Sequence, residues 1–291
     1  MQANYFYANI EVMKINLAKS AGFCFGVKRA LNIAFETAKS EKKVYMLGDI
    51  VHNEDVVQEV EKSGIKKIKG LGKGKNKILL IRAHGSPINT FNKALRDGYR
   101  VIDATCPMVK EIHKIAREME ENYYKIIVIG DKKHDEVQGI IGQLKTKAIV
   151  IDHPKHIPFK TLKRIEKCAV VVQSTQNLEN VVEIVNVLRK QIKELKFCNT
   201  ICNPTRTKQE EIKIMPKEND VMIIIGSKSS ANTKRLYEIS KSLNESSYWV
   251  SSKDEIKKEW FKNAKSVGVT AGASTPDSTT QKVIKYLWTF P

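Results

Sequence analysis

"KIIVIGDKKHDEVQG", residues 125–139, joins a short apolar strand to a polar turn and then to a helical stretch. An apolar run that ends in glycine and leads into a polar loop occurs twice more, with the loops "GDIVHNEDVV" at 48–57 and "GSKSSANTKR" at 226–235. The first glycine of each loop lies 24 residues after a cysteine: Gly48 after Cys24, Gly130 after Cys106 and Gly226 after Cys202. Three equal spacings over most of a chain indicate an internal repeat.

Each repeat shows the same order of predicted elements. A helical stretch begins at the cysteine, and a β-branched strand, the polar loop and a second helix follow it. A weaker strand comes next, at 65–68, 148–151 and 247–250, and then a last strand with a second polar loop, which ends near His84, Ser174 or Ser274. Strands that alternate with helices in this way predict an α/β fold with small, mostly parallel sheets, in which ligands collect at the carboxyl ends of the strands.

The repeat predicts three similar αβ units. We place them at residues 13–105, 106–201 and 202–291, the last with a C-terminal helix, and assign the strand before Cys24 to the first unit. A unit of about 90 residues buries little apolar surface on its own. We therefore expect a pseudo-threefold trefoil with a shared core and a central cavity, where the three repeat cysteines converge.

Composition is that of an ordinary globular protein, with 42% hydrophobic and 28% charged residues in 291. There is no secretory signal and no apolar run of about 20 residues, so we expect a cytoplasmic protein that does not enter a membrane. We also expect a monomer. The net charge of +18 is spread along the chain, which argues against a nucleic-acid-binding arm and leaves a solvated surface, an anionic substrate or an acidic protein partner. Five cysteines, an odd number, make a disulfide framework unexpected.

Three converging thiols suit a metal site. No CxxC motif is present, but soft sulfur ligands favour zinc, copper or an iron–sulfur cluster, and thiolates are stabilised at helix N-termini. Three sulfurs leave one coordination position open for a substrate oxygen, which fits reductive removal of a hydroxyl. A cluster-containing hydratase or a redox sensor stays possible. Cys168 and Cys198 have no place in the repeat and are predicted to be core thiols.

The polar loops supply hydrogen-bonding side chains at equivalent places in the three units. Four residues after the repeat glycine stand His52, His134 and Ser230, and six residues after it stand Glu54, Glu136 and Asn232. The second loops add His84, Ser174, Thr175 and Ser274. These groups predict a cavity suited to phosphate oxygens. Glu54 and Glu136 match in position, and removal of a hydroxyl needs only one proton donor near the leaving oxygen. His113, His153 and His156 have no repeat partners and are expected on the surface or in turns.

The motifs "AGFCFGVKRAL", "GDIVHN", "RAHG", "DATCP", "HDEVQG", "GSKSSANTKRL" and "TAGASTPD" resemble those of the 4-hydroxy-3-methylbut-2-enyl diphosphate reductases, the IspH/LytB family. The resemblance runs from about Met13 to Asp277. It implies a trefoil around an iron–sulfur cluster of the 4Fe-4S type that is held by Cys24, Cys106 and Cys202, with one iron not ligated by cysteine. It also implies an allylic diphosphate substrate, the last step of the non-mevalonate isoprenoid pathway, and a ferredoxin or flavodoxin as electron donor.

The same resemblance assigns roles to the loop residues. Glu136 corresponds to the proton source, and the substrate-binding group comprises His52, His84, His134, Ser174, Thr175, Ser230, Asn232 and Ser274. The chain departs from the family pattern at Ser174, where the family usually has threonine, and at Ala231, where it commonly has a second serine. Thr207 replaces a more usual asparagine.

Overall fold

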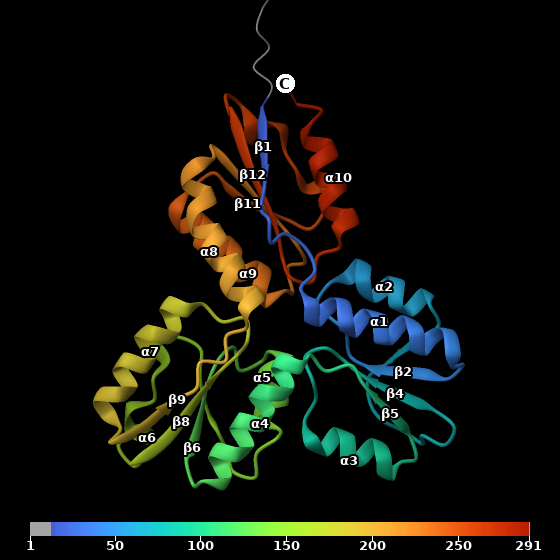
Figure 1. The fold of residues 1–291 in the computed structure, drawn as a ribbon, viewed down its shortest axis with the longest axis vertical. Coiled ribbons are helices and arrows are strands. Elements are labelled where there is room, and N and C mark those ends of the chain that lie inside the picture. Colours follow the sequence, from blue (N-terminus) through green and yellow to red (C-terminus); the bar gives the residue numbers. More distant parts are fainter. Residues whose placement is uncertain (1–12, 291) are drawn as a thin grey trace, which may run out of the picture.

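The computed structural model describes residues 13–290, in which three lobes meet at a common centre (Figure 1). Each lobe contains one four-stranded sheet, and the pairings within all three sheets are parallel. Helices cover both faces of each sheet, which explains why the central strands β6, β8 and β10 are apolar from their second residue onward. The predicted α/β trefoil is therefore confirmed.

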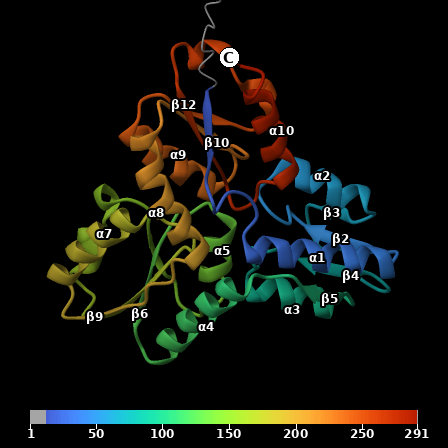
Figure 2. The same ribbon diagram turned by 45° about the horizontal axis from the view of Figure 1, so that its top comes forward.

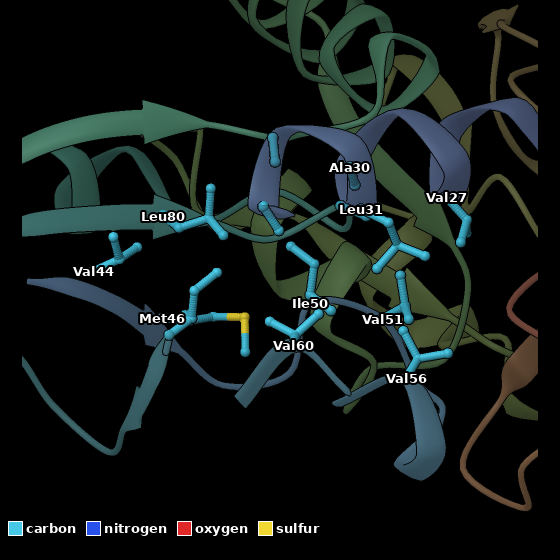
Figure 3. Packing of buried hydrophobic residues seen from close by; sticks show 14 of the residues in the cluster. Val27, Ala30, Leu31, Val44, Met46, Ile50, Val51, Val56, Val60 and Leu80 are labelled. Carbon is cyan, nitrogen blue, oxygen red and sulfur yellow. The ribbon is translucent and has the colours of Figure 1, made fainter. Parts of the chain in front are cut away.

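Lobe 1 contains the sheet with strand order β3-β2-β4-β5. Its elements are α1 (Phe25–Ser40), β2 (Val44–Leu47), α2 (Glu54–Lys62), β3 (Lys66–Ile68), β4 (Ile78–Ile81), α3 (Ile88–Arg96) and β5 (Arg100–Asp103). The buried residues of α1 recur every three or four positions and pack on the segment after β2; Leu31 lies over Ile50 and Val51 (Figure 3). Burying an aliphatic side chain contributes about 1.5–3 kcal/mol, so this packing fixes the loop that ends at His52.

Lobe 2 repeats this arrangement with strand order β7-β6-β8-β9. Its elements are α4 (Pro107–Glu121), β6 (Lys125–Ile129), α5 (Asp135–Ile141), β7 (Ile149–Ile151), η1 (Pro154–His156), α6 (Phe159–Leu162), β8 (Lys167–Val172), α7 (Leu178–Gln191) and β9 (Glu194–Phe197). One apolar cluster packs α4 and α5 on one face of the sheet, and another packs α6 and α7 on the opposite face.

Lobe 3 has the strand order β1-β12-β10-β11. Its elements are β1 (Lys14–Leu17), α8 (Asn203–Glu218), β10 (Val221–Ile225), α9 (Ala231–Leu243), β11 (Ser247–Val250), η2 (Lys253–Glu255), η3 (Lys258–Phe261), β12 (Ser266–Ala271) and α10 (Asp277–Leu287). The first and last strands of the described chain thus lie side by side, with Lys14 opposite Ser266 (Figure 1).

The position of β1 corrects the predicted first unit. The predicted unit 13–105 includes this strand, but the strand completes the sheet of lobe 3, just as β5 and β9 complete the sheets of lobes 1 and 2. Each of these three strands is followed by a repeat cysteine, so the chain leaves one lobe and enters the next immediately before the thiol. The physical reason is that β5 already occupies the place beside β4 in lobe 1, whereas the equivalent place beside β12 in lobe 3 is filled, within residues 13–290, by no other strand than β1.

Polar contacts join the lobes around the centre. Lobes 1 and 2 are joined by Arg82 Nη1 and Asp135 Oδ2 at 2.5 Å, and lobes 1 and 3 by the Ser227 hydroxyl and Glu54 Oε1 at 2.9 Å. Lobes 2 and 3 are joined by Arg235 Nη2, which contacts both carboxylate oxygens of Asp131 at 2.9 and 3.0 Å.

No helix within residues 13–290 is long and apolar enough to cross a membrane.

Candidate active site

The three repeat cysteines stand at the N-termini of three helices, one from each lobe. Cys24 caps α1, Cys106 caps α4 and Cys202 caps α8. All three line one cavity of about 280 Å³. The N-terminal ends of these helices face the centre, where the three lobes converge (Figure 2). The fold thus brings together three thiols that are far apart in the sequence, and all three are free cysteines.

The surroundings of the thiols combine burial with hydrogen-bond donors. Burial raises the pKa of Cys106, while the backbone N–H groups of Met108 and Val109, in the first turn of α4, lower it. Burial raises the pKa of Cys202 to about 11, although its sulfur lies 3.1 Å from the Thr205 hydroxyl. Burial of this kind favours the neutral thiol, and a bound metal ion would displace the proton and stabilise the thiolate.

The space beside the thiols fits an iron–sulfur cluster. Gly26 leaves room there: a Cβ atom at this position would lie 2.5 Å from Sγ of Cys106 and 3.9 Å from Sγ of Cys24. Soft sulfur donors from three separate helices, around an open volume, match the donor set of a cluster that keeps one iron accessible. Cys168 is fully buried in an apolar core and Cys198 packs against another, as predicted for core thiols.

Three histidines form a second group in the same cavity. The His52 and His84 rings stack at 4.3 Å between centroids, and the His134 ring lies 5.0 and 5.5 Å from them. Burial lowers the pKa of His52, lowers that of His84 well below its usual value, and lowers that of His134 to about 4. The three imidazoles are therefore neutral at physiological pH, and each carries one N–H donor.

The ring nitrogens of His52, His84 and His134 are close enough for a shared metal ion, since one from each residue lies within 4.8 Å of the others. A hydrogen bond argues against that use. Nδ1 of His134 accepts the backbone N–H of Glu136 at 3.2 Å, so the proton of this ring is on Nε2, which then donates and cannot coordinate. The arrangement is better suited to oxygen acceptors than to a metal.

Several polar atoms of the cavity residues lack partners. Across residues 13–290, Nε2 of His52, Nδ1 of His84 and Nδ2 of Asn232 are buried and make no hydrogen bond. Oδ2 of Asp135 lies 3.6 Å from His52 Nε2. Buried donors without partners are costly, about 1–3 kcal/mol each. A ligand with several oxygen acceptors would satisfy these three residues together.

Lobe 3 supplies the remaining polar wall. Ser230 caps α9 and accepts hydrogen bonds from the backbone N–H of Thr233 at 3.3 Å and from its hydroxyl at 3.0 Å, which leaves the Ser230 proton available. The Ser274 hydroxyl donates to the backbone oxygen of His52 at 3.1 Å. The first backbone N–H groups of α9 at Ala231 and Asn232 lie at the same wall, and helix N-termini attract anions.

Glu136 is the buried carboxyl of the cavity, with 2% of its surface exposed. Its oxygens accept hydrogen bonds from the Ser174 backbone N–H at 2.6 Å and from the Ser174 hydroxyl at 2.8 Å. Burial raises the pKa of Glu136, and the two bonds from Ser174 lower it only in part. Thr175 also lines the cavity, and its hydroxyl accepts a bond from Gln173 at 3.1 Å. A carboxyl held in this way can keep a proton near neutral pH.

Glu54, at the equivalent place in lobe 1, has a different environment. Its carboxylate accepts bonds from the Ser227 hydroxyl at 2.9 Å and the Ser229 hydroxyl at 3.3 Å, across the boundary with lobe 3. Glu54 is not among the residues that line the cavity. The two glutamates therefore occupy equivalent sequence positions, but only Glu136 is placed against the thiols and imidazoles.

Sequence reasoning missed Arg82 and Asp135. The Asp135 carboxylate lies between Arg82 and His52, so it links the loops of lobes 1 and 2 behind the imidazoles. The only signal was adjacency: Arg82 stands two residues before His84, and Asp135 stands between His134 and Glu136.

The expectation for His113 was wrong. His113 lies on the buried side of α4, one turn after Val109, and is 7% exposed. It fills the space beside Gly85 and Gly139: a Cβ atom at Gly139 would lie 3.3 Å from Nε2 of His113 and 3.3 Å from the backbone oxygen of His84. His153 and His156 lie at an exposed turn, as expected.

The fold and the cavity define a class: a three-lobed α/β protein whose central pocket is suited to cluster chemistry on a phosphorylated small molecule. The family model of the LytB protein matches residues 15–288, and the chain belongs to this family. This confirms the resemblance found in the sequence.

Known relatives span nearly the whole chain. The 4-hydroxy-3-methylbut-2-enyl diphosphate reductase of Geobacter metallireducens is 40% identical over 273 residues, which cover 94% of this chain and 96% of the relative. The reductase of the same name from Aquifex aeolicus is 42% identical over 270 residues, covering 91% and 93%.

Two solved structures are similar as well. A structure of (E)-4-hydroxy-3-methyl-but-2-enyl diphosphate reductase, the terminal enzyme of the non-mevalonate pathway, has a TM-score of 0.70 at 40% identity and covers 96% of this chain and all of its own. The E-1-hydroxy-2-methyl-but-2-enyl-4-diphosphate reductase of Plasmodium falciparum has a TM-score of 0.86 at 27% identity, covering 94% and 87%.

Proposed function

We propose that this protein reductively dehydroxylates 4-hydroxy-3-methylbut-2-enyl diphosphate to isopentenyl diphosphate and dimethylallyl diphosphate, the last step of the non-mevalonate isoprenoid pathway. The observation that carries the proposal is a single cavity that contains three thiols, three neutral imidazoles and the buried Glu136 carboxyl. Names of relatives at about 40% identity support the same substrate.

We infer that Cys24, Cys106 and Cys202 hold a 4Fe-4S cluster with one iron not ligated by cysteine. The support is the placement of these thiols at three helix N-termini, with the space beside Gly26 kept open. When bound, the cluster supplies electrons and an open iron that polarises the bond to the substrate hydroxyl.

The diphosphate is assigned to the donors on the other walls. His52, His84 and His134 offer N–H groups, and they are joined by three residues of lobe 3, Ser230, Asn232 and Ser274. Unpartnered buried nitrogens on His52, His84 and Asn232 support this assignment, because phosphate oxygens would satisfy them. Neutral donors bind the anion without adding charges that a dry cavity would have to stabilise.

Glu136 is assigned as the proton donor, with Ser174 and Thr175 beside it. Cleavage of the C–O bond consumes two electrons and two protons and releases water, and the allylic carbon takes one of these protons. A carboxyl that burial keeps protonated can deliver it, and Ser174 holds both of its oxygens in place. The serine hydroxyl keeps the bond that threonine would make at this position.

A small acidic electron carrier, a ferredoxin or a flavodoxin, is the proposed partner. The chain carries a net charge of +18. Near the thiols, the apolar side chains of Phe25 and Met108 line the cavity and are 67% and 42% exposed, and Lys28 and Lys110 are exposed on the same two helices. Exposed apolar side chains with lysines on the same helices suit an acidic redox partner, although Lys110 also pairs with Asp103 at 2.5 Å. Association with such a partner would weaken with salt. A cytoplasmic location and a monomeric state complete the proposal.

The experiment is an anaerobic assay with a chemical reductant. Protein purified without oxygen receives 4-hydroxy-3-methylbut-2-enyl diphosphate and a low-potential dye, and the products are separated by chromatography. We expect both five-carbon diphosphates to form with loss of the hydroxyl. A hydrated product, or an unchanged substrate in the presence of an intact cluster, would contradict the proposal.

A further inference from the structure

Two charged residues on α8, Lys208 and Glu211, contact the segment that leads to Cys24. This segment, residues 18–24, leaves lobe 3 at the end of β1 and enters lobe 1 at the N-terminus of α1. Its position decides where Cys24 lies relative to Cys202, which caps the N-terminus of α8 itself. A contact between α8 and this segment therefore fixes two thiols of different lobes with respect to each other.

Lys208 binds the carbonyl groups of the segment. Its ammonium donates to the backbone oxygens of Ser20 and Gly22, the latter at 3.1 Å, and to that of Ala271 at the end of β12, at 3.0 Å. Three acceptors from two separate stretches of chain use all three N–H bonds of the ammonium. Lys208 thus joins α8, the end of β12 and the approach to Cys24.

Glu211 binds the N–H groups of the same segment. Its carboxylate accepts the backbone N–H of Lys19 at 2.6 Å and that of Ser20 at 3.1 Å, as well as the Ser20 hydroxyl. Residues three apart on a helix lie on one face, so Lys208 and Glu211 contact the segment together. Lys208 thus donates to carbonyl groups of the segment, and Glu211 accepts from its backbone N–H groups.

The charge of Lys208 calls for an anionic neighbour. Lys208 is only 3% exposed, and the hydrogen-bond partners found for it among residues 13–290 are neutral carbonyl groups. Burial lowers the pKa of Lys208 to about 8, and the negative charge of the Cys24 thiolate is the largest effect that opposes this shift. A buried ammonium without a counter-ion is strongly unfavourable. Among the negative groups that act on Lys208, a thiolate at Cys24 has a larger effect than the carboxylates of Glu211 and Asp277.

We propose that Lys208 is a positioning residue that serves as the counter-charge of the cluster. Together, Lys208 and Glu211 hold Cys24 at a fixed position relative to Cys202. The proposal rests on the cluster assigned above. A positive charge beside a redox centre stabilises the reduced state, because the added electron is negative. Lys208 should therefore raise the reduction potential of the cluster, and Glu211 should lower it.

The test compares substitutions that disturb the same segment but change the charge in opposite directions. Lys208→Met removes the positive charge with little change in length, and Glu211→Gln removes the negative charge. Lys208→Arg keeps the charge, and Lys217→Met is the matched control, an exposed lysine on the same helix. Anaerobic redox titration followed by visible absorption and electron paramagnetic resonance gives the midpoint potential, and iron analysis gives the cluster content.

We expect Lys208→Met to shift the midpoint potential to more negative values and Glu211→Gln to shift it to more positive values. Lys208→Arg should restore most of the shift, and Lys217→Met should match the wild type. Loosening of the segment alone would move both variants in one direction, so shifts of the same sign, or unchanged potentials, would overturn the proposal.

If Lys208→Met assembles no cluster, the other two variants test the proposal. A positive shift of the midpoint potential in Glu211→Gln, together with a near-normal potential in Lys208→Arg, would support it. Any other pair of results would overturn it. Wild-type protein that holds no cluster would overturn the proposed function as well. A normal wild-type cluster with no opposite shifts would overturn only the role of Lys208.

Discussion

Replacing Glu136 with glutamine tests the proton-donor role, because glutamine keeps the shape of the side chain and cannot release a proton. Glu136 is 2% exposed, and its oxygens are held by the N–H and the hydroxyl of Ser174 at 2.6 and 2.8 Å. A glutamine can accept from the N–H and donate to the hydroxyl, so the cavity should keep its form. A positioned general acid contributes about 10²–10⁴-fold, so kcat should fall by that factor, which corresponds to about 3–5 kcal/mol.

The assay measures kcat under anaerobic conditions with a chemical reductant, together with iron content and the electron paramagnetic resonance spectrum. The cluster of the Glu136→Gln variant should be unchanged while turnover is lost. Glu54→Gln is the matched control, since Glu54 has the equivalent position in lobe 1 but contacts Ser227 and Ser229 instead of lining the cavity. Wild-type turnover in Glu136→Gln, or an equal loss in the control, would refute the reasoning.

Three further predictions concern the cluster space, the anion site and the response to pH. Gly26→Ala would place a Cβ atom 2.5 Å from Sγ of Cys106, so we expect loss of bound iron and a loss of stability of about 1–3 kcal/mol. The control is Gly70→Ala, where no atom lies within 4 Å of the added Cβ. Equal iron content in both variants would contradict the assignment of the cluster to this space. Asn232→Ala removes a buried donor that has no partner among residues 13–290. We expect KM to rise about 10- to 100-fold, as for a lost hydrogen bond to a charged group. An unchanged KM would exclude Asn232 from the anion site. Burial lowers the pKa of His113 from 6.5 to about 4, so the unfolded chain binds the proton first as the pH falls. The stability that this residue contributes is complete above about pH 6.5 and is lost towards pH 4. Urea unfolding of the apoprotein should show this loss of stability, and the loss should be smaller in His113→Gln. Equal pH dependence in both proteins would contradict the role of His113.

The sequence was sufficient for those parts of the fold that local patterns determine. The strands before the polar loops are β-branched and buried, and the helices after the cysteines begin where the repeat places them, with Cys24, Cys106 and Cys202 as their capping residues. Equivalent spacing in three units also predicted that His52, His84 and His134 would share a cavity, because the carboxyl ends of parallel strands meet at one edge of each sheet.

Contacts that depend on how the lobes pack could not be predicted in this way. The pairing of β1 with β12 joins residues at opposite ends of the chain, and no local pattern records which open sheet edge a strand will choose. His113 was misplaced because the lack of a repeat partner does not indicate exposure; it shares the buried face of α4 with Val109 and Ile112. Lys208 could not be identified from the sequence, because its three carbonyl partners come together only in the folded molecule.

The central claim is that three thiols from three lobes hold one iron–sulfur cluster, and electron paramagnetic resonance on anaerobically purified protein, paired with iron and sulfide analysis, tests it most directly. We predict a brown protein with about four iron atoms per chain, as a 4Fe-4S cluster requires, and a loss of this signal in Cys24→Ser, Cys106→Ser and Cys202→Ser but not in Cys168→Ser. A folded, colourless, metal-free wild-type protein would contradict the claim.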